Sequence, residues 1–85
     1  MTDPRVPLAF IPAGDEVFFS DFDDCIETFQ KEQLNAYGIV PNSTLKVLQQ
    51  HPMTVIFADE TEIALEYAIA SHIWVDRNYE VNQQN

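Results

Sequence analysis

The side chains best able to do chemistry in this 85-residue sequence are carboxylates gathered in one short stretch, which contains Asp21, Asp23, Asp24 and Glu27. Carboxylate oxygens bind hard cations, whereas a transition metal prefers mixed ligands that converge on one point. The stretch therefore predicts a solvated acidic surface. Weak and unselective cation binding by the same side chains is the alternative.

The same stretch partly matches a calcium-binding loop, in which positions 1 and 12 of a twelve-residue window carry acidic ligands and position 3 carries an oxygen ligand. Asp21, Asp23 and Glu32 stand at positions 1, 3 and 12. The fifth position is Cys25 and the sixth is Ile26, where the loop needs an oxygen ligand and a glycine. We therefore expect no calcium site.

The two histidines and the single cysteine stand apart from one another in the sequence. His51 precedes a proline and His72 lies beside an expected strand, and neither has a carboxylate at ligand spacing, so neither is expected to bind metal. Cys25 has Phe22 and Phe29 at helical spacing, which indicates a small buried hydrophobe. A reactive thiol is the alternative.

The sequence contains no recognisable catalytic constellation. Hydrolytic catalysis needs a nucleophile, a base and an orienting group, and no serine or cysteine is paired locally with a histidine. A phosphate-binding glycine loop is excluded because the chain has only two glycines. We expect a protein that is not an enzyme and has no catalytic residues, no metal ligands and no cofactor.

Composition indicates one folded, acidic domain over residues 1–85. Hydrophobic residues make up 46% of the chain, while fourteen acidic and four basic residues give a net charge of -10. Phosphate-lined surfaces repel such a chain, so nucleic acid and anionic membranes are not expected as partners. The opening MTDPRVPLAF has no basic region before an apolar block, and no apolar run could span a bilayer. We expect a cytoplasmic protein without membrane insertion.

The first half of the chain predicts a strand followed by the main helix. Three of the five prolines lie in residues 1–13, and 1–7 is expected to be an extended arm. A short strand is expected over 16–19. Ser20 then offers a helix N-cap, and the acidic residues in the next turn would interact favourably with the helix dipole. Helical spacing of apolar residues supports the helix and aligns Phe22, Cys25, Ile26 and Phe29 on one face.

Sharp turns are predicted at four residues where the backbone must reverse. Gly14 lies in a turn before the first strand, and Gly38 is placed to adopt the left-handed conformation just after the helix. Pro41 and Asn42 fit the two central positions of a type II turn, because Asn tolerates positive φ. The second half of the chain then begins with a strand.

Short strands follow at 44–49, 54–58, 62–65 and 73–75, with a single helical turn near 67–71 and a polar tail over 77–85. Alternation of apolar residues predicts eight inward side chains: Leu45, Val47, Val55, Phe57, Ile63, Leu65, Ile73 and Val75. The fold class is therefore mainly β, a small five-stranded barrel with one main inserted helix, which closes to remove its edges.

This order of elements resembles the FeoA family, the small accessory proteins of bacterial ferrous-iron uptake. Four segments carry the resemblance over residues 8–76: Ile11-Pro12-Ala13-Gly14-Asp15, Leu34-Asn35-Ala36-Tyr37-Gly38-Ile39, Pro41-Asn42-Ser43, and Ile63-Ala64-Leu65 with Ile73-Trp74-Val75. The resemblance departs at Gln33, where arginine is frequent, and at Glu66, where a basic residue is common. The partner surface is therefore expected to differ from that of typical members.

The resemblance implies an SH3-like barrel that acts as a protein–protein interaction module. Its implied partner is the cytosolic part of a FeoB-type ferrous-iron permease. Expected partner-binding residues are Lys31, Gln33 and Tyr37 at the end of the helix, with Glu66, Tyr67 and Trp74 on the other side of the barrel. The alternative function is a free-standing metal-responsive or ligand-sensing domain akin to the barrel of iron-dependent repressors. Self-association is left open.

Overall fold

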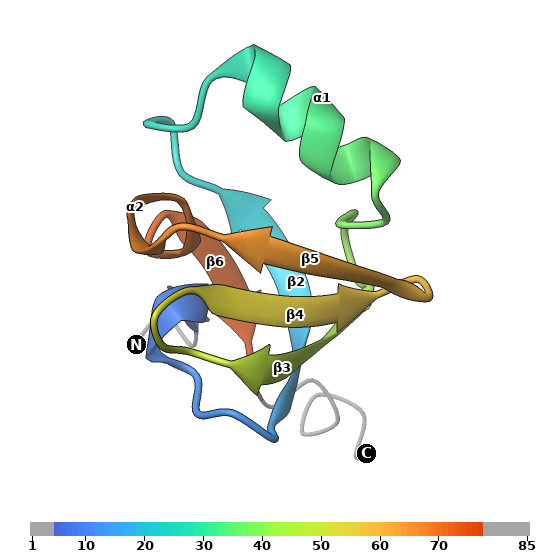
Figure 1. The fold of residues 1–85 in the computed structure, drawn as a ribbon. Helices are drawn as coiled ribbons and strands as arrows, with labels where there is room; N and C mark the ends of the chain where they lie inside the picture. Colours follow the sequence, from blue (N-terminus) through green and yellow to red (C-terminus); the bar gives the residue numbers. More distant parts are fainter. Residues whose placement is uncertain (1–4, 78–85) are drawn as a thin grey trace.

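Six strands pair side by side in one antiparallel sheet in this computed structural model, which describes residues 5–77 (Figure 1). The elements in chain order are β1 (Arg5–Pro7), the 3-10 turn η1 (Leu8–Phe10), β2 (Glu16–Phe22), α1 (Thr28–Ala36), β3 (Thr44–Gln49), β4 (Thr54–Ala58), β5 (Thr61–Leu65), α2 (Tyr67–Ala70) and β6 (Ile73–Asp76). The order across the sheet is β1-β6-β2-β3-β4-β5. No helix within 5–77 is long and apolar enough to cross a bilayer.

The mainly β fold with one main helix is confirmed, but the sheet is a barrel only loosely. Part of the expected arm forms β1, a sixth strand that pairs antiparallel with β6. Pro7 is tolerated there because an edge strand does not need every amide to donate. The end strands β1 and β5 do not pair with each other in the described chain, so the sheet stays open. The expected tail, apart from Arg77, lies outside the described residues.

The core follows the predicted alternation in three strands and reverses it in β4. The inward residues of β3, β5 and β6 are buried as predicted, namely Leu45, Val47, Ile63, Leu65, Ile73 and Val75. The prediction was wrong for β4, because Val55 is only half-buried and Phe57 is 43% exposed, whereas Ile56 is fully buried. Ile56 lies opposite the inward Val47, and cross-strand partners share a face of the sheet.

The prediction that the helix starts after Ser20 was wrong, and so was the prediction that Cys25 is buried. Strand β2 continues to Phe22, which pairs with Ile73 of β6, and α1 begins only at Thr28. Cys25 is therefore exposed in the connection, and Phe29 is 65% exposed on α1. Pairing with a strand some fifty residues away has overridden the local capping signals, as tertiary context commonly does.

A tight corner connects α1 to β3. Gly38 has φ of +105°, and its N–H donates to the carbonyl of Asn35 at 3.0 Å while Ile39 N–H donates to Leu34 at 3.0 Å. This pair of bonds is a Schellman motif, which satisfies the last carbonyls of the helix. Asn42 has φ of 71°, and a 3.0 Å hydrogen bond from Ser43 to Val40 closes the turn. Both reversals thus depend on residues that tolerate positive φ.

Replacing Gly38 with alanine should lower the free energy of unfolding. An added Cβ would lie 2.5 Å from the Cβ of Asp59, in the turn between β4 and β5, at a backbone φ of +105°. Strain of this kind costs on the order of 1–3 kcal/mol. Urea unfolding followed by circular dichroism measures the loss.

Gly14→Ala is the matched control, because Gly14 has φ of +100° and a Cβ there would meet no described heavy atom within 4 Å. Gly38→Ala should cost more than Gly14→Ala. Adding Asp59→Gly to the Gly38→Ala variant should remove most of that difference. Equal losses for the two alanine variants would contradict the proposed clash with Asp59.

The reversed phase of β4 predicts unequal effects of two neighbouring substitutions. Ile56→Ala should cost on the order of 2–5 kcal/mol of unfolding free energy, because it empties a fully buried position. Phe57→Ala should cost clearly less, since Phe57 is 43% exposed. Thermal and urea unfolding of both variants measures the two losses of unfolding free energy. A larger loss for Phe57→Ala than for Ile56→Ala would mean that β4 has the opposite phase in solution.

Candidate functional site

Helix α1 stands beside β5 and buries little of its own surface. Leu34 is the one buried side chain among the nine residues of α1, all of which are described. Strand β5 pairs with β4 along one edge, and its other edge faces α1 without a partner strand in the described chain (Figure 1). A helix and an unpaired strand edge therefore enclose a surface groove between them.

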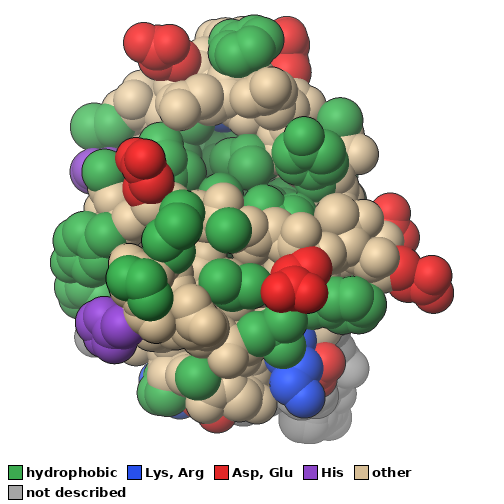
Figure 2. Space-filling view, in the orientation of Figure 1, with side chains coloured by type: hydrophobic (Ala, Val, Ile, Leu, Met, Phe, Trp, Pro, Cys, Tyr) green, Lys and Arg blue, Asp and Glu red, His purple; other side chains and the backbone are tan. Residues whose placement is uncertain are grey.

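We call this surface the α1–β5 groove. It consists of two adjoining hollows that share Tyr37, Ile63 and Ala64. The other lining residues are Gln30, Gln33, Leu34, Thr61, Glu62, Leu65 and Ile69. Figure 2 shows the hollow below α1 with hydrophobic side chains in it. The groove is thus apolar in its floor and polar along parts of its rim.

The helix face that lines the groove follows a regular spacing. Gln30, Gln33, Leu34 and Tyr37 stand at i, i+3, i+4 and i+7, which places them on one side of a helix. The stripe from Phe22 to Phe29, predicted as the helix face, lies mostly before α1, so the face that lines the groove was not predicted. The later spacing was the available signal. The remaining lining residues on β5 could not be found without knowing that its outer edge is unpaired.

The structure brings together some of the predicted partner-binding residues and separates others. Gln33 and Tyr37 line the groove, and Tyr37 is 48% exposed. Glu66 and Tyr67 are exposed and lie in the chain between two groove-lining residues, Leu65 and Ile69, but do not themselves line the groove.

The other two predicted partner-binding residues do not line the groove. Lys31 is half-buried on α1, away from the lining positions. Trp74 is half-buried on β6, with the guanidinium of Arg5 5.5 Å from its ring centre. A cation over an aromatic ring at this distance is an attractive contact. Trp74 therefore has a packing role between β1 and β6.

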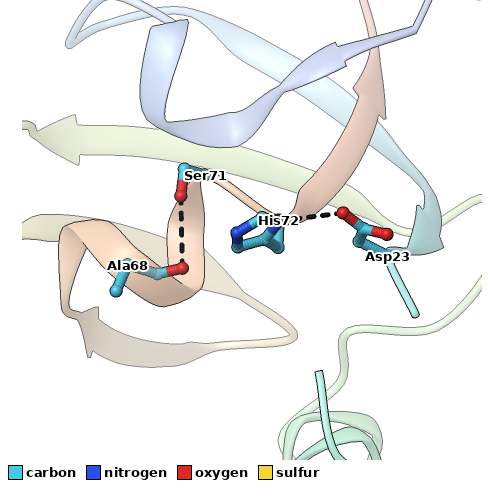
Figure 3. A network of polar contacts seen from close by, with 4 residues as sticks. All are labelled: Asp23, Ala68, Ser71 and His72. Atoms are coloured by element: carbon cyan, nitrogen blue, oxygen red, sulfur yellow. Dashed lines mark hydrogen bonds and ion pairs between the residues drawn. The ribbon is translucent and has the colours of Figure 1, made fainter. Parts of the chain in front are cut away.

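A second cluster, made of side chains that can act as metal ligands, lies where β2 ends and β6 begins. Nδ1 of His72 is 2.8 Å from Oδ2 of Asp23, as Figure 3 shows. One ligand atom from each of Asp23, Cys25 and His72 lies within 4.8 Å of the others. His72, for which the sequence offers no carboxylate at ligand spacing, therefore has one beside it in the fold. The two residues are 49 positions apart, so sequence spacing could not reveal the contact.

Strand register places this cluster. Phe18 and Phe19 pair with Asp76 and Val75, after which a bulge shifts the register before Phe22 pairs with Ile73. Asp23 and His72 are the next residues along, and the Asp23 N–H donates to the His72 carbonyl at 2.9 Å. A one-residue slip would turn each side chain to the other face of the sheet. The bulge thus decides that Asp23 meets His72.

The hydrogen bond with His72 lowers the pKa of the Asp23 carboxyl below its ordinary value of 3.8. Partial burial opposes this shift, and backbone hydrogen bonds from Asp24 and Cys25 add to it. A lowered carboxyl pKa stabilises the fold above the ordinary value, and the contribution is lost as the pH falls through the lowered pKa. Asp23 is therefore an ionised acceptor at neutral pH.

Comparison with known proteins identifies the family. A family model described as the FeoA domain matches residues 6–77. A crystal structure of an iron uptake regulatory protein (FeoA) matches with a TM-score of 0.71 and 24% sequence identity, covering 85% of this chain and 94% of that one. The solution structure of the FeoA protein from Chlorobium tepidum matches with a TM-score of 0.78 and 21% identity, covering 86% and 70%.

The same fold occurs in a larger protein of a different kind. A manganese-dependent transcriptional repressor matches with a TM-score of 0.77 and 24% identity over 91% of this chain, which spans only 44% of the repressor. Comparison with curated proteins gives no match. At these identities the structural neighbours establish a shared SH3-like fold. Because the FeoA model covers nearly all of the described chain, this protein belongs to the FeoA domain family.

Proposed function

We propose that this protein is a non-catalytic interaction module of ferrous-iron uptake that binds the cytosolic part of a FeoB-type permease through the α1–β5 groove. The observation that carries this proposal is the unpaired edge of β5 beside an apolar hollow. An open strand edge offers a row of backbone donors and acceptors, and native proteins usually cover it. A partner segment that adds a strand there would satisfy those groups.

Strand addition also gives the groove a means of choosing its partner. Backbone hydrogen bonds to β5 supply affinity, while pockets beside the strand select alternate side chains of the added segment. Ile63 and Leu65 are buried, and the side of the hollow formed by Leu34 and Ile69 is apolar. The groove therefore favours an extended segment with apolar residues at every second position.

The negative charge near the groove predicts which residues flank the apolar positions of the partner segment. Glu62 lines the groove, the exposed Glu66 follows the lining residue Leu65 in the chain, and the whole chain has a net charge of -10. Opposite charge on the partner speeds encounter and suppresses wrong pairings. We expect lysine or arginine beside the apolar residues of the bound segment. The family resemblance supports the proposed partner, and the apolar groove supports the proposed docking surface.

Binding of the purified cytosolic part of the permease, measured by calorimetry, tests the surface. Tyr37→Ala should weaken binding on the order of tenfold, because a half-exposed aromatic at the centre of a groove is a typical hot spot. Ala64→Arg should weaken it at least as much, since Ala64 lines both hollows and the longer side chain would fill them. Both variants should keep the wild-type melting temperature, since both positions are exposed.

Phe10→Ala is the matched control, because Phe10 is 64% exposed on η1 and does not line the groove. It should leave the affinity unchanged. Raised salt should weaken wild-type binding if the partner segment is basic. Folded Tyr37→Ala and Ala64→Arg variants that bind as well as wild type would overturn the choice of surface. A wild-type chain that fails to bind the permease would overturn the choice of partner.

A further inference from the structure

We propose that Asp23, Cys25 and His72 bind one borderline divalent transition-metal ion, such as Zn²⁺ or Fe²⁺, at a surface site separate from the α1–β5 groove. None of the three residues lines that groove. The proposal concerns the chain alone and does not depend on any partner. It also revises the expectation, based on sequence spacing, that the chain has no metal ligands.

The ligand atoms are close enough for one ion to reach all three. Zinc bonds to nitrogen and oxygen are about 2.0–2.2 Å and to sulfur about 2.3 Å, so ligand atoms around one ion lie roughly 3–4 Å apart. Here they lie within 4.8 Å of one another, and the His72 nitrogen and the Asp23 oxygen are 2.8 Å apart. An ion would take the place of the hydrogen bond between these two atoms, with only a small separation of the side chains.

The backbone around the ligands is held by hydrogen bonds before any ion binds. Asp23 and His72 are joined by the 2.9 Å bond between their main chains, and Ile26 N–H donates to the Asp23 carbonyl at 3.0 Å, which closes the turn that contains Cys25. On the other side, His72 N–H donates to the Ile69 carbonyl at 3.0 Å. Ligands on such a fixed frame lose little freedom when they bind.

The donor set selects a class of metal. One imidazole nitrogen, one thiol sulfur and one carboxylate oxygen suit borderline ions, whereas Ca²⁺ and Mg²⁺ require oxygen ligands. On binding, the thiol loses its proton, and the thiolate with the carboxylate balances the charge of a divalent ion. Cys25 is exposed, so a fourth position stays open to water or another ligand. The site has the composition of an open metal site.

Cobalt titration of the full chain under anaerobic, reducing conditions tests the proposal. One equivalent of Co²⁺ should produce a thiolate-to-metal charge-transfer band together with visible bands of a low-symmetry site, and Zn²⁺ should displace it. Cys25→Ser should abolish the charge-transfer band. His72→Gln and Asp23→Asn should keep that band but weaken binding by more than about tenfold, since loss of even an outer partner of a metal ligand costs ten- to a hundredfold.

Asp24→Asn and His51→Gln are the matched controls, one a neighbouring carboxylate and the other the second histidine. Both should bind Co²⁺ as wild type does, and excess Ca²⁺ or Mg²⁺ should not compete. Absence of the charge-transfer band would overturn the proposal. So would unchanged affinity in His72→Gln, which would mean that Cys25 binds the ion as an isolated thiol, or saturation at half an equivalent, which would mean that two chains share it. None of these three results bears on partner binding, which is measured separately.

Discussion

The pairing of β2 with β6 is the constraint on which most of this molecule depends. It joins two strands that are far apart in sequence, carries β1 on its outer side and β3 on its inner side, and extends β2 to Phe22. Because β2 does not end at Ser20, the chain needs a connection before α1 can begin at Thr28. That connection holds Asp23 and Cys25, so the same pairing that delays the helix also creates the cluster with His72.

The sheet remains open because of the order in which the strands lie beside one another. β6 takes the position beside β2, so β5 is left at the far edge, and α1 lies next to it without covering its length (Figure 1). Gly38, at the end of the α1 corner, lies close to Asp59 of the β4–β5 turn, and Ile69 of α2 lines the groove. The groove is therefore a consequence of topology.

The sequence could predict whatever depends on local chemistry. Ile63, Leu65, Ile73 and Val75 alternate as strands facing a core, and Gly38 and Asn42 are the residue types that positive φ requires. It could not predict features that depend on distant pairing. The Ser20 cap and the acidic turn favour a helix locally, but β6 draws those residues into a strand. The phase of β4 was likewise set by Val47 across the sheet, and not by the apolar pattern of β4 itself.

The residues of the candidate sites also divide into those that the local sequence predicts and those that depend on distant pairing. Gln33 and Tyr37 could be named from the helix end, whereas Ile63 and Ala64 became groove residues only when the outer edge of β5 proved unpaired. His72 and Asp23 are far apart in the sequence, and the bulge in β2 places them side by side in the fold. Asp23 and Cys25 precede α1 in the chain, and His72 N–H donates to the carbonyl of Ile69, which lines the groove together with α1. An ion at the cluster could alter partner affinity only by moving α1 or Ile69 relative to β5, since coupling between two sites requires that they bias the same conformational change.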